Sequence, residues 1–440
     1  MSKRVLICNR GEISARILRT LRKMNITSIA VYSDADKNSP YTSLADEAYY
    51  IGPSNPAKSY LNMENIIRTA KFAKADAIHP GYGFLSENEK FAKMVEDKGF
   101  IWIGPNPDVM TKLSSKIECR RIAKKASVPI TPGTGILKKN SVESDISNIG
   151  FPLLLKPDRG GGGKGIKRIF SSGEVMNAFQ SATSESLYAF GNSDLYAEKY
   201  VEDARHVEIQ IVADRSGNVF SLGERDCSVQ RRYQKIIEEA PSPKVSQGLR
   251  EKMYEVAKNF ITASGYDAVG TLEFIIDKAG NPYFMEINER IQVEHPVTEE
   301  TTGLDIVRLQ IENGFDGKVS ISKDYYPQGH AIEARVYAED PETFFPSPGQ
   351  ITLLQIPKIR NIRIDHSLAN MIRISPFYDP LLAKVISRGK SRSEALNSLL
   401  DYFPSLRIEG IKTNIPLIER LLSSEEYRSG DIDTSFMDKK

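Results

Sequence analysis

The sequence predicts a multidomain protein of mixed α/β and α+β class, and three observations support this. A short apolar segment at 5–8 is followed by a turn, by apolar residues at helical spacing (13, 17, 18, 21) and by a second apolar segment at 28–32, which together describe a βαβ unit. The 440 residues suffice for two or three domains. With 40% hydrophobic and 26% charged residues, we expect a folded, soluble chain.

The elements in chain order divide the sequence into three parts. Strand candidates at 77–79 and 100–104 extend the βαβ unit, so residues 1–112 should form an open, Rossmann-like α/β domain. The character changes at Pro129, and residues of about 131–202 resemble a small lid hinged on a larger body spanning 113–334. The remainder, 335–440, is a mixed α/β region with a clear helix at 392–402.

Charge and cysteine content exclude several functional classes. The formal net charge of +2 gives no reason to expect nucleic acid or an anionic membrane as a partner. Cys8, Cys119 and Cys227 are far apart and lack CxxC spacing, so we expect reduced thiols in the cytoplasm rather than disulfides or a zinc site. Strand-like sequence from Arg4 leaves no room for a leader, and no apolar segment approaches a membrane span.

The most informative stretch is a predicted hairpin around the turn at 277–281. If the stretch after the turn is extended, Glu286, Asn288, Arg290, Gln292 and Glu294 share one face. The hairpin places Glu273 opposite Glu286, and two opposed carboxylates repel unless a cation lies between them. Oxygen ligands from Glu273, Glu286 and Asn288 suit Mg²⁺ or Mn²⁺. The alternative is an ordinary solvated surface hairpin.

A run of four glycines at 160–163 predicts a phosphate-binding loop. Glycines allow backbone N–H groups to surround an anion, and Lys156 and Lys164 add positive charge. The loop is not a Walker A motif, and a flexible linker is the alternative. Taken alone, Lys116 and His206 would be surface residues, and the basic stretch at 230–235 would be a solvated turn as readily as a site.

Six motifs resemble those of the biotin carboxylase family. They are NRGEI at 9–13, HPGYGFLSEN at 79–88, the glycine run, RHVEIQ at 205–210, ERDCS at 224–228 and RIQVEHP at 290–296. The match extends from about residue 3 to about residue 437. It implies an ATP-grasp fold, in which a lid closes over a nucleotide bound between two sheets.

The resemblance also implies roles for individual residues. Those expected to contact ATP are Lys116, Lys156, Gly162, Gly163, Glu198, Lys199, Val201, His206, Gln230, Tyr233, Glu273 and Glu286. Those expected to hold the metal are Glu273, Glu286 and Asn288. Those expected to hold bicarbonate are Lys235, Arg290, Gln292, Val293 and Glu294. Tyr82 and Arg335 are expected to face biotin, and the catalytic set is Lys235, Arg290, Glu294 and Arg335.

The activity implied by the resemblance is MgATP-dependent (or MnATP-dependent) carboxylation of biotin by bicarbonate, through carboxyphosphate. Glu294 would deprotonate bicarbonate, and Arg335 would stabilise the enolate-like oxygen of biotin. The chain has no Met-Lys-Met biotinylation site, so biotin would arrive on a separate biotin carboxyl carrier protein. A carboxyltransferase subunit would complete an acyl-CoA or pyruvate carboxylase, and the family resemblance implies a homodimer.

Two other functions fit part of the sequence. A carbamoyl-phosphate synthase-like enzyme also makes carboxyphosphate, but that family duplicates the module. A silent regulatory subunit would not need the intact set of Lys235, Arg290 and Glu294. Two positions depart from the family: Tyr233 stands where histidine is usual, and Glu289 replaces a small or neutral residue. We expect Tyr233 to alter ATP affinity, and Glu289 to point away from the site.

Overall fold

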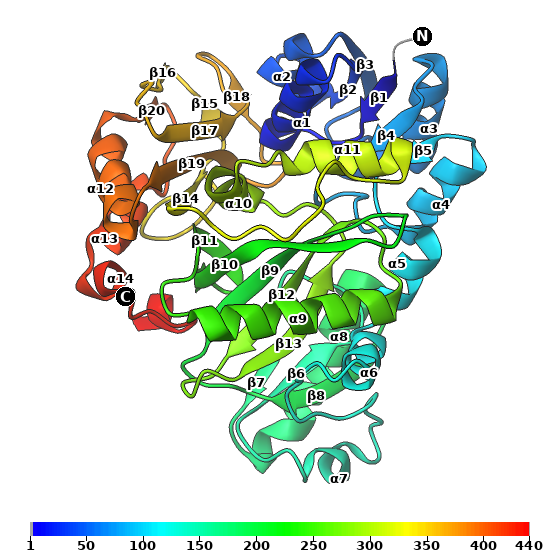
Figure 1. Cartoon of the computed structure of the whole chain (residues 1–440), viewed down its shortest axis with the longest axis vertical. Helices are drawn as coiled ribbons and strands as arrows, with labels where there is room; N and C mark the ends of the chain where they lie inside the picture. The colour runs from blue at the N-terminus through cyan, green and yellow to red at the C-terminus, as the bar shows by residue number, and fades with distance from the viewer. Residues whose placement is uncertain (1–2, 440) are drawn as a thin grey trace.

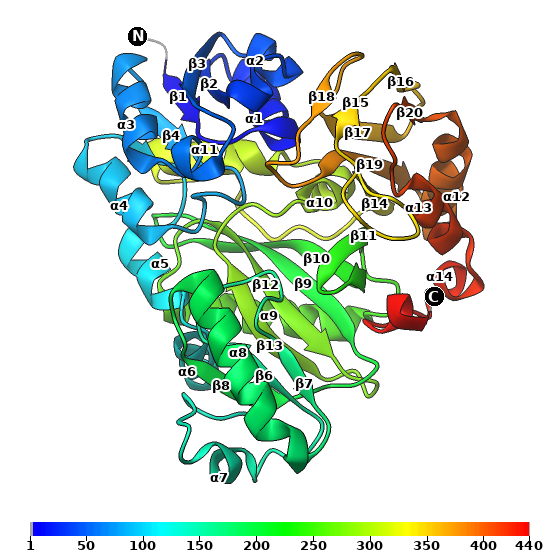
Figure 2. The same cartoon turned by 180° about the vertical axis from the view of Figure 1, so that it is seen from behind.

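The computed structural model describes residues 3–439, and its N-terminal part is an open parallel sheet (Figures 1 and 2). The strand order is β3-β2-β1-β4-β5. The strands are β1 (Arg4–Ile7), β2 (Thr27–Ser33), β3 (Glu47–Gly52), β4 (Ala77–His79) and β5 (Ile101–Trp102). The helices are α1 (Gly11–Lys23), α2 (Pro40–Leu44), α3 (Met63–Phe72), α4 (Glu89–Asp97) and α5 (Pro107–Leu113). The predicted βαβ unit is confirmed.

Both faces of this sheet are covered, as the uninterrupted apolar strands require. Val5 and Ile7 pack with residues of α1 and of α11 (Ile306–Asp316), whereas Leu6 and Cys8 pack with residues of α3 and α4 on the opposite face. Helix α1 carries Glu12 in its first turn and basic residues in its last, as the helix dipole favours.

Residues 131–202, which we call the lid unit, contain a sheet and a core of their own. The antiparallel sheet has the order β7-β6-β8, formed by β6 (Leu153–Pro157), β7 (Lys167–Ile169) and β8 (Leu195–Lys199). Helices α7 (Val142–Ile146) and α8 (Val175–Phe190) pack on it around a separate apolar cluster. The unit projects from one end of the molecule, opposite the parallel sheet (Figure 1).

The body is built on one eight-stranded sheet of order β13-β12-β9-β10-β11-β14-β19-β17. Its strands are β9 (Arg205–Ala213), β10 (Val219–Arg231), β11 (Gln234–Ala240), β12 (Val269–Ile276), β13 (Pro282–Asn288), β14 (His330–Tyr337), β17 (Ile362–His366) and β19 (Leu381–Gly389). Helices α6 (Lys116–Lys125), α9 (Gln247–Ser264) and α10 (His295–Thr302) pack beside it. The boundary expected at 334/335 falls inside β14, so this sheet continues through it.

The C-terminal region adds short strands and a helical layer. It contains β15 (Gly349–Gln350), β16 (Leu353–Gln355), β18 (Arg373–Ile374), β20 (Arg407–Glu409), α12 (Arg392–Tyr402), α13 (Ile415–Ser423) and α14 (Glu425–Ser429). The predicted helix at 392–402 is confirmed as α12. All three cysteines are free and buried. Among residues 3–439, no helix combines the length and the apolar character needed to cross a membrane.

The hairpin of β12 and β13 confirms one prediction and corrects another. Glu273 lies directly opposite Glu286, and a β-bulge next to this pair, at Met285, sets that register. The extended face, however, ends at Asn288, so it was wrong to continue the alternation to Glu294. The chain turns there because helix α10 begins at residue 295 with a proline in its first turn.

Candidate active site

One cavity of about 1640 Å³ lies where the lid unit, the eight-stranded sheet and the N-terminal domain meet. Its wall includes every residue that the sequence predicts for the site except Glu294, which lies behind the wall and is fully buried. These residues come from segments as distant as Tyr82 and Arg335, so the fold brings the predicted set together. A cavity of this size accommodates a nucleotide together with a second substrate.

The glycine run forms a loop between β6 and β7 at the edge of the cavity. Gly162 and Gly163 have φ values of 67° and 74°, a region that favours glycine. The Lys116 ammonium donates a hydrogen bond to the Gly160 carbonyl at 2.6 Å. Tyr233 packs against the loop, because a Cβ atom on Gly163 would lie 2.6 Å from its Cδ2. The tyrosine that departs from the family pattern therefore contacts the lid directly.

A buried ion cluster lies deeper under the lid. The Glu198 carboxylate accepts from Lys156 Nζ and from Arg120 Nη1, both at 2.9 Å. Burial raises the pKa of Glu198, but the charges of Lys156 and Arg120 outweigh burial and hold it below its ordinary value. Sequence reasoning missed Arg120, whose only signal was a cation on the buried side of an amphipathic helix.

The three predicted metal ligands face the cavity from the β12–β13 hairpin. Asn288 Nδ2 donates to Glu273 at 2.9 Å, and the Lys116 ammonium lies 3.2 Å from Glu286. Burial raises the pKa of Glu273, yet nearby Lys235 and His206 lower it well below the ordinary carboxyl value. The carboxylates of Glu273 and Glu286 and the amide oxygen of Asn288 lie on one wall, and this set of oxygen donors fits a hard divalent cation such as Mg²⁺ or Mn²⁺.

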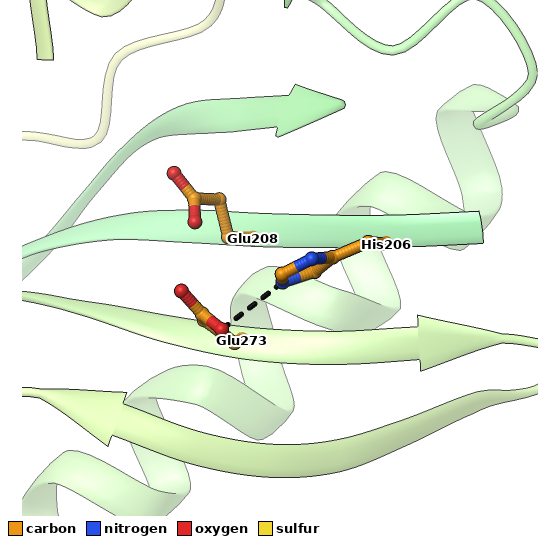
Figure 3. Close-up of side chains that lie close together, drawn as sticks. All are labelled: His206, Glu208 and Glu273. Carbon is orange, nitrogen blue, oxygen red and sulfur yellow. Dashed lines mark hydrogen bonds and ion pairs between the residues drawn. The ribbon is translucent and has the colours of Figure 1, made fainter. Parts of the chain in front are cut away.

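A second group of possible ligands is His206, Glu208 and Glu273, whose donor atoms lie within 4.8 Å of one another (Figure 3). His206 Nε2 is 3.1 Å from Glu273. The Lys235 ammonium, however, lies 2.6 Å from Glu208 and 2.8 Å from Glu273. Glu208 already pairs with both Lys235 and Arg225 and does not line the cavity, so this group serves better as an anchor for Lys235 than as a metal site.

Lys235 lies at the centre of the proposed bicarbonate region. In addition to Glu208 and Glu273, its ammonium contacts Glu294 at 2.7 Å. Arg225 holds the far side of Glu208 at 2.5 Å, with both side chains fully buried. Glu208 and Arg225 were not predicted as site residues. The alternation in RHVEIQ, which puts Glu208 on the same face as His206, could have indicated Glu208. The charged ERDCS segment of β10 could have indicated Arg225.

Glu294 is a buried carboxylate held in its ionised form. Burial raises its pKa, but Lys235, Arg335 and Arg225 together lower it well below the ordinary value. Arg335 Nη2 donates to Glu294 Oε2 at 2.8 Å. Arg290 lines the same cavity, and its guanidinium donates to Gln292 at 3.0 Å and to Asn288 at 3.1 Å. The site therefore joins an anionic base to three cations beside one cavity.

The predicted biotin residues, Tyr82 and Arg335, both line the cavity. The Tyr82 hydroxyl donates to Glu12, and Lys384 Nζ lies 3.2 Å from the same carboxylate. Arg335 also pairs with Glu238, a residue that sequence reasoning missed. Glu289 is buried but does not line the cavity, as expected. The alternation that predicted this runs only to Asn288, the last residue of β13, so Glu289 lies just beyond the strand.

Comparison with known proteins yields consistent matches along the chain. Family models match as the biotin carboxylase N-terminal domain (1–110), the carbamoyl-phosphate synthase L chain ATP-binding domain (115–319) and the biotin carboxylase C-terminal domain (333–439). Biotin carboxylase 2 of Bacillus subtilis is 47% identical over 441 residues, covering 99% of each chain.

Two solved structures are similarly close. A biotin carboxylase β,γ-ATP complex from Campylobacter jejuni has a TM-score of 0.98 at 37% identity, covering 100% of this chain and 99% of that one. The biotin carboxylase domain dimer of Hydrogenobacter thermophilus 2-oxoglutarate carboxylase, solved with MgADP and bicarbonate, has a TM-score of 0.97 at 40% identity over 100% and 98%. The matches span the three regions that form the cavity, and this chain belongs to the biotin carboxylase family.

Proposed function

We propose that this chain carboxylates biotin held on a separate carrier protein, using ATP and bicarbonate through carboxyphosphate. The observation that carries the proposal is the buried Glu294 carboxylate, held ionised by Lys235 and Arg335 beside a cavity of nucleotide size. A base must be ionised to accept a proton, and here it lies next to cations able to hold the bicarbonate anion.

The nucleotide would occupy the cavity under the lid unit. Lys116, Lys156 and His206, with the backbone of Gly162 and Gly163, would contact the phosphates. Glu198, Lys199 and Val201 would border the adenine, and Gln230 and Tyr233 would make further nucleotide contacts. Glu273, Glu286 and Asn288 would hold Mg²⁺ or Mn²⁺, which offsets charge on the phosphoryl oxygens.

Bicarbonate would be held by Lys235, Arg290, Gln292 and Val293. Glu294 removes its proton, and the resulting dianion attacks the γ-phosphate, giving carboxyphosphate and ADP. Carboxyphosphate breaks down to CO₂ and phosphate, and the phosphate takes the ureido N–H proton of biotin. Arg335 stabilises the enolate-like oxygen while the biotin nitrogen attacks CO₂, and Tyr82 faces the biotin ring. The lid excludes water from these intermediates.

The proposal extends to organisation and partners. We divide the chain into domains at 1–112, 113–334 and 335–440, with the lid unit in the second. The partners would be a biotin carboxyl carrier protein and a carboxyltransferase subunit, and the chain would act as a cytoplasmic homodimer. A dimer is named for the Hydrogenobacter domain, and relatives include one subunit of the Methanothermobacter thermautotrophicus pyruvate carboxylase and the alpha chain of the Rattus norvegicus mitochondrial methylcrotonoyl-CoA carboxylase.

The decisive experiment measures ADP release with and without bicarbonate, and then with free biotin or with biotinylated carrier. We expect bicarbonate-dependent release that biotin stimulates, with a higher kcat/KM for the carrier, because docking raises the effective concentration of biotin. Glu294→Gln should abolish the bicarbonate-dependent part. Bicarbonate-dependent release that biotin does not stimulate would favour carbamoyl-phosphate synthase-like chemistry, for which the match at 115–319 is the motivation.

A further inference from the structure

Behind the biotin end of the cavity lies a pair of carboxyl groups that the mechanism above does not use. Glu238 on β11 and Glu333 on β14 are direct partners in the antiparallel register. Both are 0% exposed, and neither lines the cavity. Side chains opposed in this way project on the same face of the sheet with their Cβ atoms about 5 Å apart.

The pair cannot carry two negative charges. Both carboxylate oxygens of Glu333 lack a hydrogen-bond partner among the described residues, and an isolated buried carboxylate is very costly. Burial raises the pKa of Glu333 well above its ordinary value, against the opposing charge of Lys384. Burial likewise raises the pKa of Glu238 to about 7, although Arg335 acts against it. Both shifts favour the protonated form, and the pKa of Glu238 lies near neutrality.

Arg335 connects this pair to the catalytic base. Its Nη2 atom contacts Glu238 and also donates to Glu294 Oε2 at 2.8 Å, so one nitrogen links both carboxylates. The other nearby cations are committed elsewhere. Lys384 on β19 donates to the Val293 carbonyl at 2.8 Å and pairs with Glu12 at 3.2 Å. Lys235 lies on β11 and holds Glu294 from its other side.

The proton balance of the reaction indicates a role for this pair of carboxyl groups. At neutral pH, ATP, bicarbonate and biotin become ADP, hydrogen phosphate and carboxybiotin with net release of one proton. In the proposed mechanism that proton first resides on Glu294, which must lose it before the next turnover. A proton on Glu294 weakens the ion pairs of that carboxylate with Lys235 and Arg335, so moving the proton to a neighbouring carboxylate restores both pairs.

We propose that Glu238, backed by the neutral acid Glu333, accepts the proton that Glu294 removes from bicarbonate. The O–H bond on Glu294 breaks and one on Glu238 forms, which restores the anionic base. Neutral Glu238 no longer competes for Arg335, whose charge becomes available to the ureido oxygen of biotin. When the products leave, Arg335, which lines the cavity, pairs with Glu238 again and lowers its proton affinity, and the proton passes to water that enters the emptied cavity. This step rests on the proposed function and assigns Glu238 a role within it.

The test compares bicarbonate-dependent ADP release, without biotin, in wild type, Glu238→Gln, Glu238→Asp and Glu333→Gln. Proton-transfer groups typically contribute about 10²–10⁴-fold, so we expect Glu238→Gln to lower kcat at least about tenfold, with Glu238→Asp recovering part of the loss. Wild-type kcat should fall as the pH drops through about 7, and Glu238→Gln should lose this limb. Glu333→Gln, which keeps a neutral group opposite Glu238, should retain the acidic limb that Glu238→Gln loses.

The matched control is Glu339→Gln, a carboxylate just beyond the end of β14 that pairs with Arg231 instead. It should leave the rate and the pH profile unchanged. The same variants are then assayed with added biotin. If Glu238→Gln keeps both kcat and the acidic limb, and only its KM for biotin rises, Glu238 merely supports Arg335 and the proposal is overturned. A wild type without bicarbonate-dependent ADP release would instead refute the proposed function.

An infrared titration detects protonated carboxyl groups directly, so it tests the pair without relying on enzyme activity. The unliganded protein should retain a protonated carboxyl band well above the ordinary glutamate pKa of about 4.3. Burial also raises the pKa of Glu289, so the pair is identified by the difference band that Glu333→Gln removes from wild type at neutral pH. If Glu333→Gln removes no protonated-carboxyl band at neutral pH, the pair holds no proton and the inference fails, whatever the enzyme assays show.

Discussion

Replacing Lys235 by methionine should test the electrostatic design of the site more sharply than any other change. The Lys235 ammonium lies 2.6, 2.8 and 2.7 Å from the carboxylates of Glu208, Glu273 and Glu294. Those three side chains are at most 7% exposed, so water cannot replace the lost charge. Methionine keeps the approximate length of the side chain and removes only the ammonium.

The expected loss of stability follows from this geometry. Removing one partner from a buried ion cluster costs about 3–5 kcal/mol, because the remaining charges stay uncompensated. For a domain of this size, each kcal/mol corresponds to roughly 2–4 °C in Tm, so Lys235→Met should unfold roughly 6–20 °C below wild type. Bicarbonate-dependent ADP release should fall about 10²–10³-fold, as when one preorganised donor is lost from an active site.

Thermal unfolding and ADP release, measured on the same preparations, check both parts. Lys235→Arg is the control, because it keeps the charge and changes only its shape. We expect the arginine variant to recover most of the lost Tm but only part of the activity, since a planar guanidinium cannot contact three carboxylates with the same geometry. If the methionine variant were as stable and as active as wild type, the reasoning about the cluster would be refuted.

Three further predictions follow from other contacts. Gly163→Ala should raise the KM for ATP about tenfold, because the added Cβ would lie 2.6 Å from Tyr233 and the alanine would need a φ of 74°. Steady-state kinetics of the double variant Gly163→Ala, Tyr233→Ala should show that the KM for ATP partly recovers. Tyr233→His should change the KM for ATP while leaving kcat nearly constant, and a collapse of kcat would instead reveal a chemical role. The Glu239 carboxylate pairs with His330 at 2.6 Å and with Arg392 at 2.7 Å. Burial raises the pKa of Glu239, but these hydrogen bonds lower that pKa below the ordinary value. Its stabilisation is therefore present at neutral pH and lost as the pH falls below about 4.5, so the Tm gap between wild type and Glu239→Gln should close in acid.

Local patterns predicted much of the architecture because they report local geometry. Apolar segments with turns between them defined β1, β2 and β4, and helical spacing defined α1 and α12. The opposition of Glu273 and Glu286 was predicted from their distances to the turn, but a bulge at Met285, which the sequence reasoning did not include, produces it. An unbulged hairpin around the same turn would have paired Glu273 with Met285 instead.

The residues that sequence reasoning missed are those whose partners come from distant strands. Glu208 becomes a site residue only because Arg225 and Lys235 reach it from β10 and β11. Glu238 was unremarkable in sequence because its partners, Glu333 and Arg335, lie on β14 nearly a hundred residues away. Propensity and periodicity do not report which strands become neighbours across such distances.

The continuity of the eight-stranded sheet limits how this enzyme can be divided or recombined. Lys235 lies on β11 and Arg335 on β14, which are adjacent strands. The sequence boundary at 334/335 separates these two residues and falls inside β14. A chimaera joined at that boundary would cut β14 in two and separate the bicarbonate and biotin ends of the reaction. The lid unit has its own sheet and core, so it is the segment that exchange between relatives could transplant intact. Nucleotide handling can therefore diversify independently, while the carboxylation chemistry must be inherited as one piece.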